Sequence, residues 1–505
     1  MATDDFFRAR LDGMVDPRHP LAVLAQRMPW AQIESSLAPL FARKARSGKL
    51  MADADLFGTT AYVAAGGVSR AGRPRLPIRL MVSLLYLKHA FNESDESVCA
   101  RWSENVVWQL FSGMDYYQAK LPCDATQIGR FRRVLGEAGV EQLLKTTIET
   151  ALAIKAVKKS EFERVIVDST VQEKAIAHPT DSRLLEVARE KIVRLAQRAG
   201  LKLKMTHERE GRTLRRRAGG YAHAKQFKRL RQVLRRQRTI LGVLLREVRR
   251  KMTTLSEAAQ AQLDVWLQRV ERIHAQRPSD KNKLYALHAP EVECIGKGKA
   301  RKPYEFGVKV SLSVTHKSGL MVGARSFPGN PFDGHTLAAQ LEQTGTLLQD
   351  IGVTPKIAVV DLGYRGVDKE IAPVELIHRG KHKTLSAEQR RWLKRRQAIE
   401  PLIGHTKQDH GMQRCWLKGS DGDALHAVLC AAGFNIRWLM RALLRQLGAS
   451  GLKHVFLALM ALCAKQLTGL PASLRAPAAP PHGPRSAIAL PTPVRRWSND
   501  FVAVA

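Results

Sequence analysis

Two short apolar runs in this sequence each stop at an aspartate, and they restrict the possible folds more than any other feature. Residues 164–168 read RVIVD and residues 356–361 read KIAVVD, so the runs end at Asp168 and Asp361. A short apolar run between polar residues predicts a buried strand, and open α/β sheets build their sites at strand ends. If the two strands are neighbours, both carboxylates lie together, and such oxygen ligands favour Mg²⁺ or Mn²⁺. For either residue alone, the alternative is a turn or helix cap.

A third acidic residue, Glu400, lies in a basic stretch, residues 385–407, that has the pattern of a helix. Glu400 either pairs with Arg396, four residues earlier, or points into a site. Pro401 disfavours helical geometry at the residue before it, which predicts a kink or a helix restart at Glu400. Three carboxylates could hold two metal ions that activate an attacking oxygen and stabilise a leaving oxygen on a phosphodiester.

The charge of the chain predicts a polyanionic partner. It has 82 Lys and Arg against 46 Asp and Glu, a net charge of +36, while its apolar and charged fractions are those of a globular protein. The longest apolar run, residues 455–464, is too short to span a bilayer, and the N-terminus lacks the pattern of a signal peptide. The six cysteines show no CxxC pair, so we expect reduced thiols of a cytosolic protein rather than a disulfide or zinc framework.

Nearly half of the charge excess lies in residues 183–250, which hold 22 Lys and Arg against five Asp and Glu. Apolar residues at helical spacing predict two long amphipathic helices, about 183–200 and 227–252, with basic outer faces. Glycines between them predict a break from residue 211 to residue 226. We favour nucleic-acid contact by these helices over a solvated basic surface. The candidate contacts in the intervening stretch are Arg215, Arg216 and Arg217.

The remaining pattern predicts helices before the first strand and a hairpin after the basic helices. Three helices, about 77–91, 94–113 and from 124, are compatible with a helix-turn-helix domain in which Arg130 and Arg133 contact DNA. The alternative is a helical bundle with solvated arginines. A hairpin turns at residues 318–319, and a helix over 336–352 and a short strand over 374–380 follow.

Other polar residues offer weaker signals. Asp333 and His335, in PGNPFDGHT, are a rival acid and a possible ligand, but the surrounding glycines and prolines favour a turn-capping Asp333. Glu305 lies in an alternating strand and could face solvent or the site. The histidines at positions 178, 223, 405 and 410 show no metal-ligand spacing, although the last two flank Lys407 and could contact DNA.

Several blocks of the sequence resemble the DDE transposases of bacterial insertion sequences. VDST at 167–170, VDLGYRG at 360–366 and IEPLIGHTK at 399–407 are similar to the three acidic blocks of that family. The similarity extends over roughly residues 1–445 and is strongest to the branch named after insertion sequence five. The resemblance implies that Asp168, Asp361 and Glu400 form the catalytic, metal-binding triad.

The same resemblance implies DNA contacts beside the triad. The third block of the family carries a Tyr, an Arg, the Glu and a Lys at fixed spacings, and Arg396 and Lys407 match the two basic positions. The tyrosine position is occupied by Leu393, and Leu362 follows the second aspartate; both are departures from the family pattern. In the second block, Tyr364 and Arg365 are retained and are expected to contact DNA.

The resemblance implies an α/β fold: a ribonuclease H-like mixed sheet with a large basic α-helical insertion, preceded by an all-α, helix-turn-helix-like domain. The expected parts are an N-terminal segment at 1–75 and a helical DNA-binding domain at 76–150. The catalytic domain takes 151–180 and 301–445, and the basic insertion takes 181–300. A C-terminal helix and a disordered basic tail follow at 446–505.

The implied function is that of a transposase that binds the terminal inverted repeats of an insertion sequence and catalyses DNA cleavage and strand transfer with two Mg²⁺ or Mn²⁺ ions. The implied partners are double-stranded DNA, from both the repeats and the target, and a second copy of the chain in a homodimer or larger assembly. The expected location is the bacterial cytoplasm, in association with the nucleoid, with no membrane contact. The alternatives are a ribonuclease H-like nuclease that cuts without joining and an inactive DNA-binding protein.

Overall fold

The fold was analysed in a computed structural model that describes residues 9–41, 76–296 and 303–446 with their side chains. It also describes the backbone of the last helix as far as Thr468 and of four short strands: β1 (Arg43–Lys44), β2 (Leu50–Met51), β3 (Tyr62–Ala64) and β4 (Gly67–Ser69). Contacts divide the chain into one unit up to Gln446 and a second from Leu447 onward. The tail expected beyond about residue 470 lies outside the described residues.

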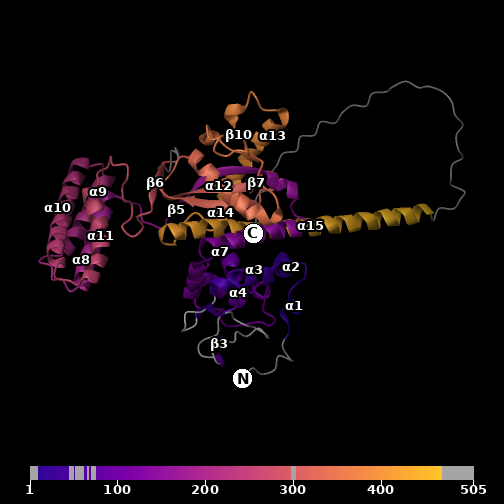
Figure 1. The fold of residues 1–505 in the computed structure, drawn as a ribbon, viewed down its shortest axis with the longest axis horizontal. Coiled ribbons are helices and arrows are strands. Elements are labelled where there is room, and N and C mark those ends of the chain that lie inside the picture. Colours follow the sequence, from indigo (N-terminus) through magenta and orange to yellow (C-terminus); the bar gives the residue numbers. More distant parts are fainter. Residues whose placement is uncertain are drawn as a thin grey trace. The chain divides into compact units, whose positions relative to one another are not determined.

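A six-stranded mixed sheet forms the centre of the first unit (Figure 1). Its strands are β5 (Arg164–Glu173), β6 (Glu293–Gly296), β7 (Tyr304–Thr315), β8 (Met321–Phe327), β9 (Ile357–Val359) and β10 (Glu375–Ile377). The order is β10-β9-β5-β7-β6, and β8 also pairs with β7. The first three strands of that order run parallel, whereas β7 is antiparallel to β5, β6 and β8. The predicted hairpin is β7–β8, with Gly319 at a positive φ of 69° in its turn.

Helices cover the sheet and share its apolar core. Helix α12 (Asp333–Leu348) packs on β7 and β8, and α14 (Ile399–Asp409) packs on β5. Asn435, in α15 (Gly419–Thr468), links three elements because its side-chain amide bonds to both backbone groups of Met321 and to Thr147 at 2.9–3.0 Å. A buried amide with all these partners fixes the position of the helix against β8.

Apart from the first, short helix, the helices before β5 pack into the same apolar cluster as the sheet. The helices before β5 are α1 (Leu11–Met14), α2 (Pro20–Arg27), α3 (Trp30–Leu37), α4 (Ile78–Ala90), α5 (Asp95–Glu104), α6 (Val106–Phe111) and α7 (Ala125–Ala153). The helix predicted over 94–113 is two helices, because Asn105 leaves helical geometry and caps α6 by accepting a hydrogen bond from the backbone of Trp108 at 3.0 Å. Helix α7 is kinked at Gly136, whose φ of 60° and ψ of −170° interrupt the helix.

The insertion between β5 and β6 holds four helices with an apolar core of their own. They are α8 (Asp181–Arg198), α9 (Glu208–His223), α10 (Phe227–Met252) and α11 (Glu257–Ala275), and they lie side by side (Figure 1). The predicted break over 211–226 is wrong, because most of that stretch is α9. Leu214 and Ala218, one turn apart, give this helix a buried stripe, and the chain reverses only after His223.

Helix α15 contains the one described stretch, Gly419–Gln446, that is long and apolar enough to cross a membrane. The test rests on length and composition, and 78% of its apolar window is buried inside the protein. This burial is expected of a core helix. The absence of membrane contact that the sequence leads us to expect stays a prediction.

Candidate active site

The parallel pairing of β5 and β9 places the two predicted aspartates side by side. Ile166 pairs with Val359 at the end of the ladder, and continuing this register by two residues brings Asp168 opposite Asp361. Paired residues of parallel strands point to the same face of a sheet. Asp361 ends its run by capping a short 3₁₀ turn, Leu362–Tyr364, where it accepts a hydrogen bond from Gly363 N–H at 2.8 Å. This cap was the alternative for a single aspartate, and here it coexists with a position beside Asp168.

Glu400 is linked to Asp168 through Arg396, whose guanidinium lies close to both carboxylates. Nη1 of Arg396 lies 3.2 Å from Oδ2 of Asp168, and its Nη2 lies 3.8 Å from Oε1 of Glu400. The side chains of Arg396 and Asp168 are 19% and 16% exposed, whereas that of Glu400 is 66% exposed. Arg396 therefore contacts two of the three predicted carboxylates. Of the two options that the sequence left open for Glu400, the pairing with Arg396 is present, and the role in a site stays a prediction.

The helix restart predicted at Glu400 is confirmed. Helix α13 (Ala387–Arg395) ends in a 3₁₀ turn over Arg396–Ala398, and α14 then begins at Ile399. Pro401 lies in the first turn of α14, where its missing N–H costs no helical hydrogen bond. The backbone keeps right-handed helical angles through the 3₁₀ turn, and Glu400 lies in the first turn of α14.

Asp333 is a fourth carboxylate at this site. Oδ1 of Asp333 accepts hydrogen bonds from Ser169 Oγ at 2.8 Å and from Lys309 Nζ at 3.0 Å. A Cβ atom added to Gly363 would lie 3.1 Å from Oδ2 of Asp333 and 3.1 Å from Oδ1 of Asp361, so these two oxygens are separated by at most twice that distance. The side chain of Asp333 thus faces the site, and the turn-capping role favoured from the sequence is wrong. His335 is exposed, with its ring against Phe332.

Tyr364 is buried close to Asp168, Asp333 and Asp361. Its side chain is fully buried. Burial raises the pKa of the Tyr364 hydroxyl well above its usual value, and the nearby charges of the three aspartates add to the increase. A tyrosine in this position remains protonated and packs below the site, so it is poorly placed to meet DNA directly. Arg365, the next residue, is exposed.

The other predicted basic residue of the third block, Lys407, is paired. Its Nζ lies 3.7 Å from Oε2 of Glu305, so the strand acid that the sequence left undecided points inward. Leu393, which stands at the family tyrosine position, is half-buried against the core and lines a cavity with Asp361 and Arg396. His405 forms an ion-pair contact with Asp409 at 2.7 Å, whereas His410 is buried and contacts the backbone oxygen of His89.

A basic cavity of about 680 Å³ adjoins the carboxylates. Asp361 and Arg396 line one side of it, and the remaining charged groups come from α13 and the turn after β10. The Lys and Arg side chains that line it are Arg379, Arg390, Arg391, Lys394 and Arg396. Such a groove attracts phosphate groups to the acidic residues at its edge.

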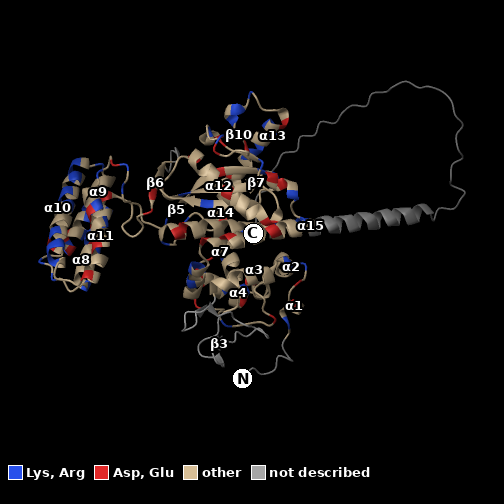
Figure 2. Cartoon of the chain, viewed as in Figure 1, with Lys and Arg blue, Asp and Glu red and all other residues tan. Residues whose placement is uncertain are grey.

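Predicted DNA contacts outside the site lie on exposed surfaces. Arg130 and Arg133 are exposed on α7, whereas their neighbour Arg132 is buried and pairs with Asp95 at 2.9 Å. The three consecutive arginines of α9, residues 215–217, are all exposed, and Lys and Arg recur along the insertion helices (Figure 2). These positions leave the side chains accessible to DNA.

Sequence reasoning missed Lys309 and Ser169, and it assigned Asp333 a different role. Lys309 is the lone charged residue in the run VKVSLSV, most of which is buried. A charge in a buried strand requires a partner, so this signal was present in the sequence. The partner, 24 residues away across the sheet, could not be identified from spacing.

Comparisons with known proteins match two separate parts of the chain. A family model described as a transposase domain (DUF772) matches residues 58–134, and one described as a transposase DDE domain matches residues 367–440. The second range contains Arg396, Glu400 and Lys407, whereas Asp168 and Asp361 lie outside both ranges.

One relative is a protein of Rhizobium meliloti described as "Uncharacterized protein ORF8 in nfe locus". It is 40% identical over 225 residues, which cover 44% of this chain and 95% of that protein. No solved structure matches the chain significantly. The resemblance seen in the acidic blocks is thus confirmed at the level of the family, and the chain belongs to the DDE transposase family.

Proposed function

We propose that the protein cleaves DNA at the ends of an insertion sequence and joins the freed strands to target DNA. The observation that carries this proposal is the parallel pairing of β5 with β9, which ends two residues before both Asp168 and Asp361, together with the contacts of Arg396 to Asp168 and Glu400. The mixed sheet, in which two central strands carry these aspartates, supports a ribonuclease H-like catalytic domain. Assignment to the branch named after insertion sequence five rests on the sequence blocks alone.

The donor set fits divalent cations. Asp168, Asp361 and Glu400 offer carboxylate oxygens, which Mg²⁺ and Mn²⁺ prefer over nitrogen or sulfur. Two such ions, when bound, supply charge neutralisation and activation for the attacking and leaving oxygens of a phosphodiester. Arg396 occupies one oxygen of Asp168, so it must release that oxygen before the carboxylate can serve fully as a ligand.

The side chains around the carboxylates then position the DNA. Arg396, once released, lies beside the basic cavity and can contact a phosphate with a planar, two-pronged donor. The remaining basic residues of the cavity guide the strand toward the acids. The exposed arginines of α9 and α7 supply charge to hold the rest of the duplex, including the terminal repeats, and α4–α7 serve as the helix-turn-helix-like reader. Two ends held together require at least two copies of the chain, acting on DNA in the bacterial cytoplasm.

The test uses duplex DNA that carries the sequences flanking the gene, with Mg²⁺ or Mn²⁺ and a target plasmid. The wild-type protein should nick at the repeat ends and give joined products, and Asp168→Asn and Asp361→Asn should abolish both. Glu342→Gln is the matched control, since Glu342 is an exposed acid on α12 that pairs with Arg325. Unchanged cleavage and joining by Asp168→Asn would overturn the assignment.

Two outcomes would select the alternatives. Nicking by the wild type without any joined product would identify a nuclease. Binding without cleavage in either metal ion would identify a DNA-binding protein that has lost its activity. Short inverted repeats around the gene, with duplicated target bases outside them, would support the transposase directly.

A further inference from the structure

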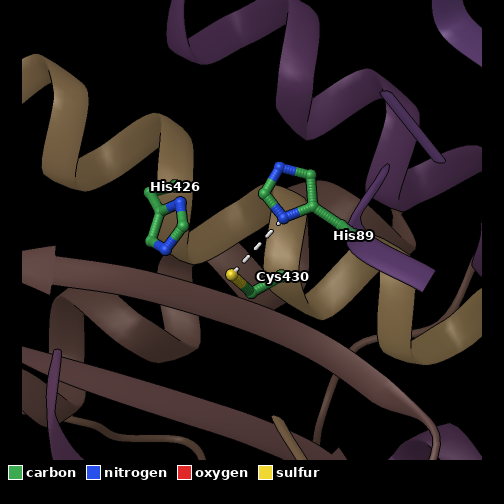
Figure 3. A group of neighbouring side chains, drawn as sticks. All are labelled: His89, His426 and Cys430. Carbon is green, nitrogen blue, oxygen red and sulfur yellow. Dashed lines mark hydrogen bonds between the residues drawn. The ribbon is translucent and has the colours of Figure 1, made fainter. Parts of the chain in front are cut away.

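Three metal-binding side chains meet in the interior, away from the four carboxylates. His89 lies in the last turn of α4, and His426 and Cys430 lie one turn apart on the same face of α15. One ligand atom from each residue lies within 4.8 Å of the other two, and the three side chains converge on a common space (Figure 3). All three side chains are buried.

The two helices are in direct backbone contact at this point. A Cβ atom added to Gly433 would lie 2.7 Å from the backbone oxygen of His89 and 2.5 Å from its Cβ. Glycine at this position therefore permits the close approach that brings His89 over Cys430. Nδ1 of His89 and Sγ of Cys430 are 3.6 Å apart.

The hydrogen bonding of His426 leaves one of its ring nitrogens available to a metal ion. Nε2 of His426 lies 3.0 Å from the backbone oxygen of Gly411, which can only accept, so this nitrogen carries the proton and Nδ1 keeps its lone pair. Such a contact on the far nitrogen is the usual support of a metal-ligating histidine.

His89 has an unexplained polar atom. Its Nε2 is buried, and no hydrogen-bond partner for it exists among the described residues. The other ring nitrogen, Nδ1, faces Cys430. A metal ion bound through Nδ1 would leave Nε2 as the ring's N–H, so the ion itself would not supply the missing partner of this atom.

The spacing suits zinc. Bond lengths of about 2.3 Å to sulfur and 2.0–2.1 Å to nitrogen in a tetrahedron place S and N ligands roughly 3.5 Å apart. The distance between His89 and Cys430 already matches this value, and a small rotation of the His426 ring would close the wider gap. Imidazole and thiolate together favour Zn²⁺ over the hard ions expected at the carboxylates.

We propose that His89, His426 and Cys430 bind one Zn²⁺ ion that ties α4 to α15. As the zinc–sulfur bond forms, the thiol of Cys430 gives its proton to solvent, and the two imidazoles bind as neutral ligands. His89 and His426 also line a cavity of about 880 Å³, through which the ion and a water molecule as fourth ligand can reach the site. None of the predicted catalytic carboxylates belongs to this group, and the ion would secure the packing of the N-terminal helices on the last helix of the first unit.

The test uses the full-length protein, purified without a histidine tag. Metal analysis should find about one zinc per chain after dialysis, and replacement by Co²⁺ should give a sulfur-to-cobalt charge-transfer band. The carboxylate site cannot produce this band, because it contains no sulfur. Cys430→Ala should lose the band and the zinc, whereas Cys99→Ala, at an equally buried cysteine on α5, should keep both.

Two results would overturn the proposal. The first is a wild-type protein that neither retains zinc nor shows the cobalt–thiolate band, a measurement that does not depend on the folding of any variant. The second is a Cys430→Ala protein with a native circular dichroism spectrum that binds zinc as tightly as the wild type. Neither result bears on transposition, which is tested at Asp168 and Asp361.

Discussion

Replacing Arg396 by glutamine should tighten the binding of Mn²⁺ while it weakens strand transfer. Arg396 donates to Asp168 at 3.2 Å, and both side chains are less than 20% exposed. A cation that uses this oxygen must first displace the guanidinium. Glutamine removes the positive charge that competes with a metal ion for Asp168. The same change removes a phosphate contact, so DNA processing suffers.

The size of the effect follows from the contact. A hydrogen bond to a charged group in a partly buried position contributes about 1.5–3 kcal/mol. At about 1.4 kcal/mol for each factor of ten, loss of this contact should raise the affinity for Mn²⁺ roughly tenfold to a hundredfold. Coulomb attraction at this distance is of the same order for an effective dielectric constant near 20.

The assay is calorimetric titration of Mn²⁺ into the protein without DNA, at fixed ionic strength. Lys394→Gln is the matched control. Lys394 is exposed, lines the same basic cavity and carries the same charge as Arg396, but the contact to Asp168 is made by Arg396. It should leave Mn²⁺ affinity nearly unchanged. An Arg396→Gln protein that has an unaltered circular dichroism spectrum and binds Mn²⁺ no more tightly than the wild type would refute this reasoning. Arg396 then does not compete with the metal ion for Asp168, and the metal site lies elsewhere.

Three further predictions concern DNA binding, pH and packing. Alanine at the three arginines of residues 215–217 should reduce the slope of log affinity against log salt by up to about three, and equal slopes would return this patch to a solvated surface. Burial lowers the pKa of His410 and of His426 to about 4, so the unfolded chain binds more protons than the folded chain below pH ~6.5. The free energy of unfolding of the metal-free protein should therefore fall by about 1.4 kcal/mol per pH unit for each ring as the pH falls toward 4. Melting temperatures measured over this range should fall, and a flat profile would contradict the prediction. Gly433→Ala should destabilise the protein by about 1–3 kcal/mol because the added methyl group meets the backbone of His89. Gly219→Ala, in open space on α9, should stabilise the protein by up to ~1 kcal/mol. Equal melting temperatures for the two variants would refute the α4–α15 contact.

The sequence predicted the strands and the basic helices better than it predicted their junctions. The apolar run before Asp361 is β9, and the hairpin turns where expected. The strand predicted to end at Asp168 is wrong in its end, because β5 continues to Glu173 and Asp168 lies in the middle of it. The errors lie where side chains compete with local rules. Asn105 splits a predicted helix by capping a new one, and the glycines of α9 do not interrupt it because its buried stripe holds the helix against its neighbours.

The site itself was predictable only in part. Sequence spacing cannot show that residues nearly two hundred positions apart share a register, so the juxtaposition of Asp168 and Asp361 required the fold. The role of Asp333 depends on Lys309 across the sheet, and turn chemistry pointed elsewhere. His426 and Cys430 have helical spacing, but their third partner comes from α4, which no local pattern connects to α15. The roles of the predicted site residues remain predictions until tested.

The charges at the site are arranged in pairs, and this arrangement explains why the large positive excess lies elsewhere. Asp168 contacts Arg396, Asp333 contacts Lys309, and Glu305 lies close to Lys407. Partly buried acids without partners would be costly in the free protein, and paired ones are not. When metal ions and DNA bind together, a carboxylate of these pairs can exchange its arginine or lysine for a metal ion. The released arginine or lysine side chain can then bind a DNA phosphate. The charges of these three pairs can stay balanced at either stage. The excess that holds the duplex can then be carried by the insertion, far along the chain from the chemistry.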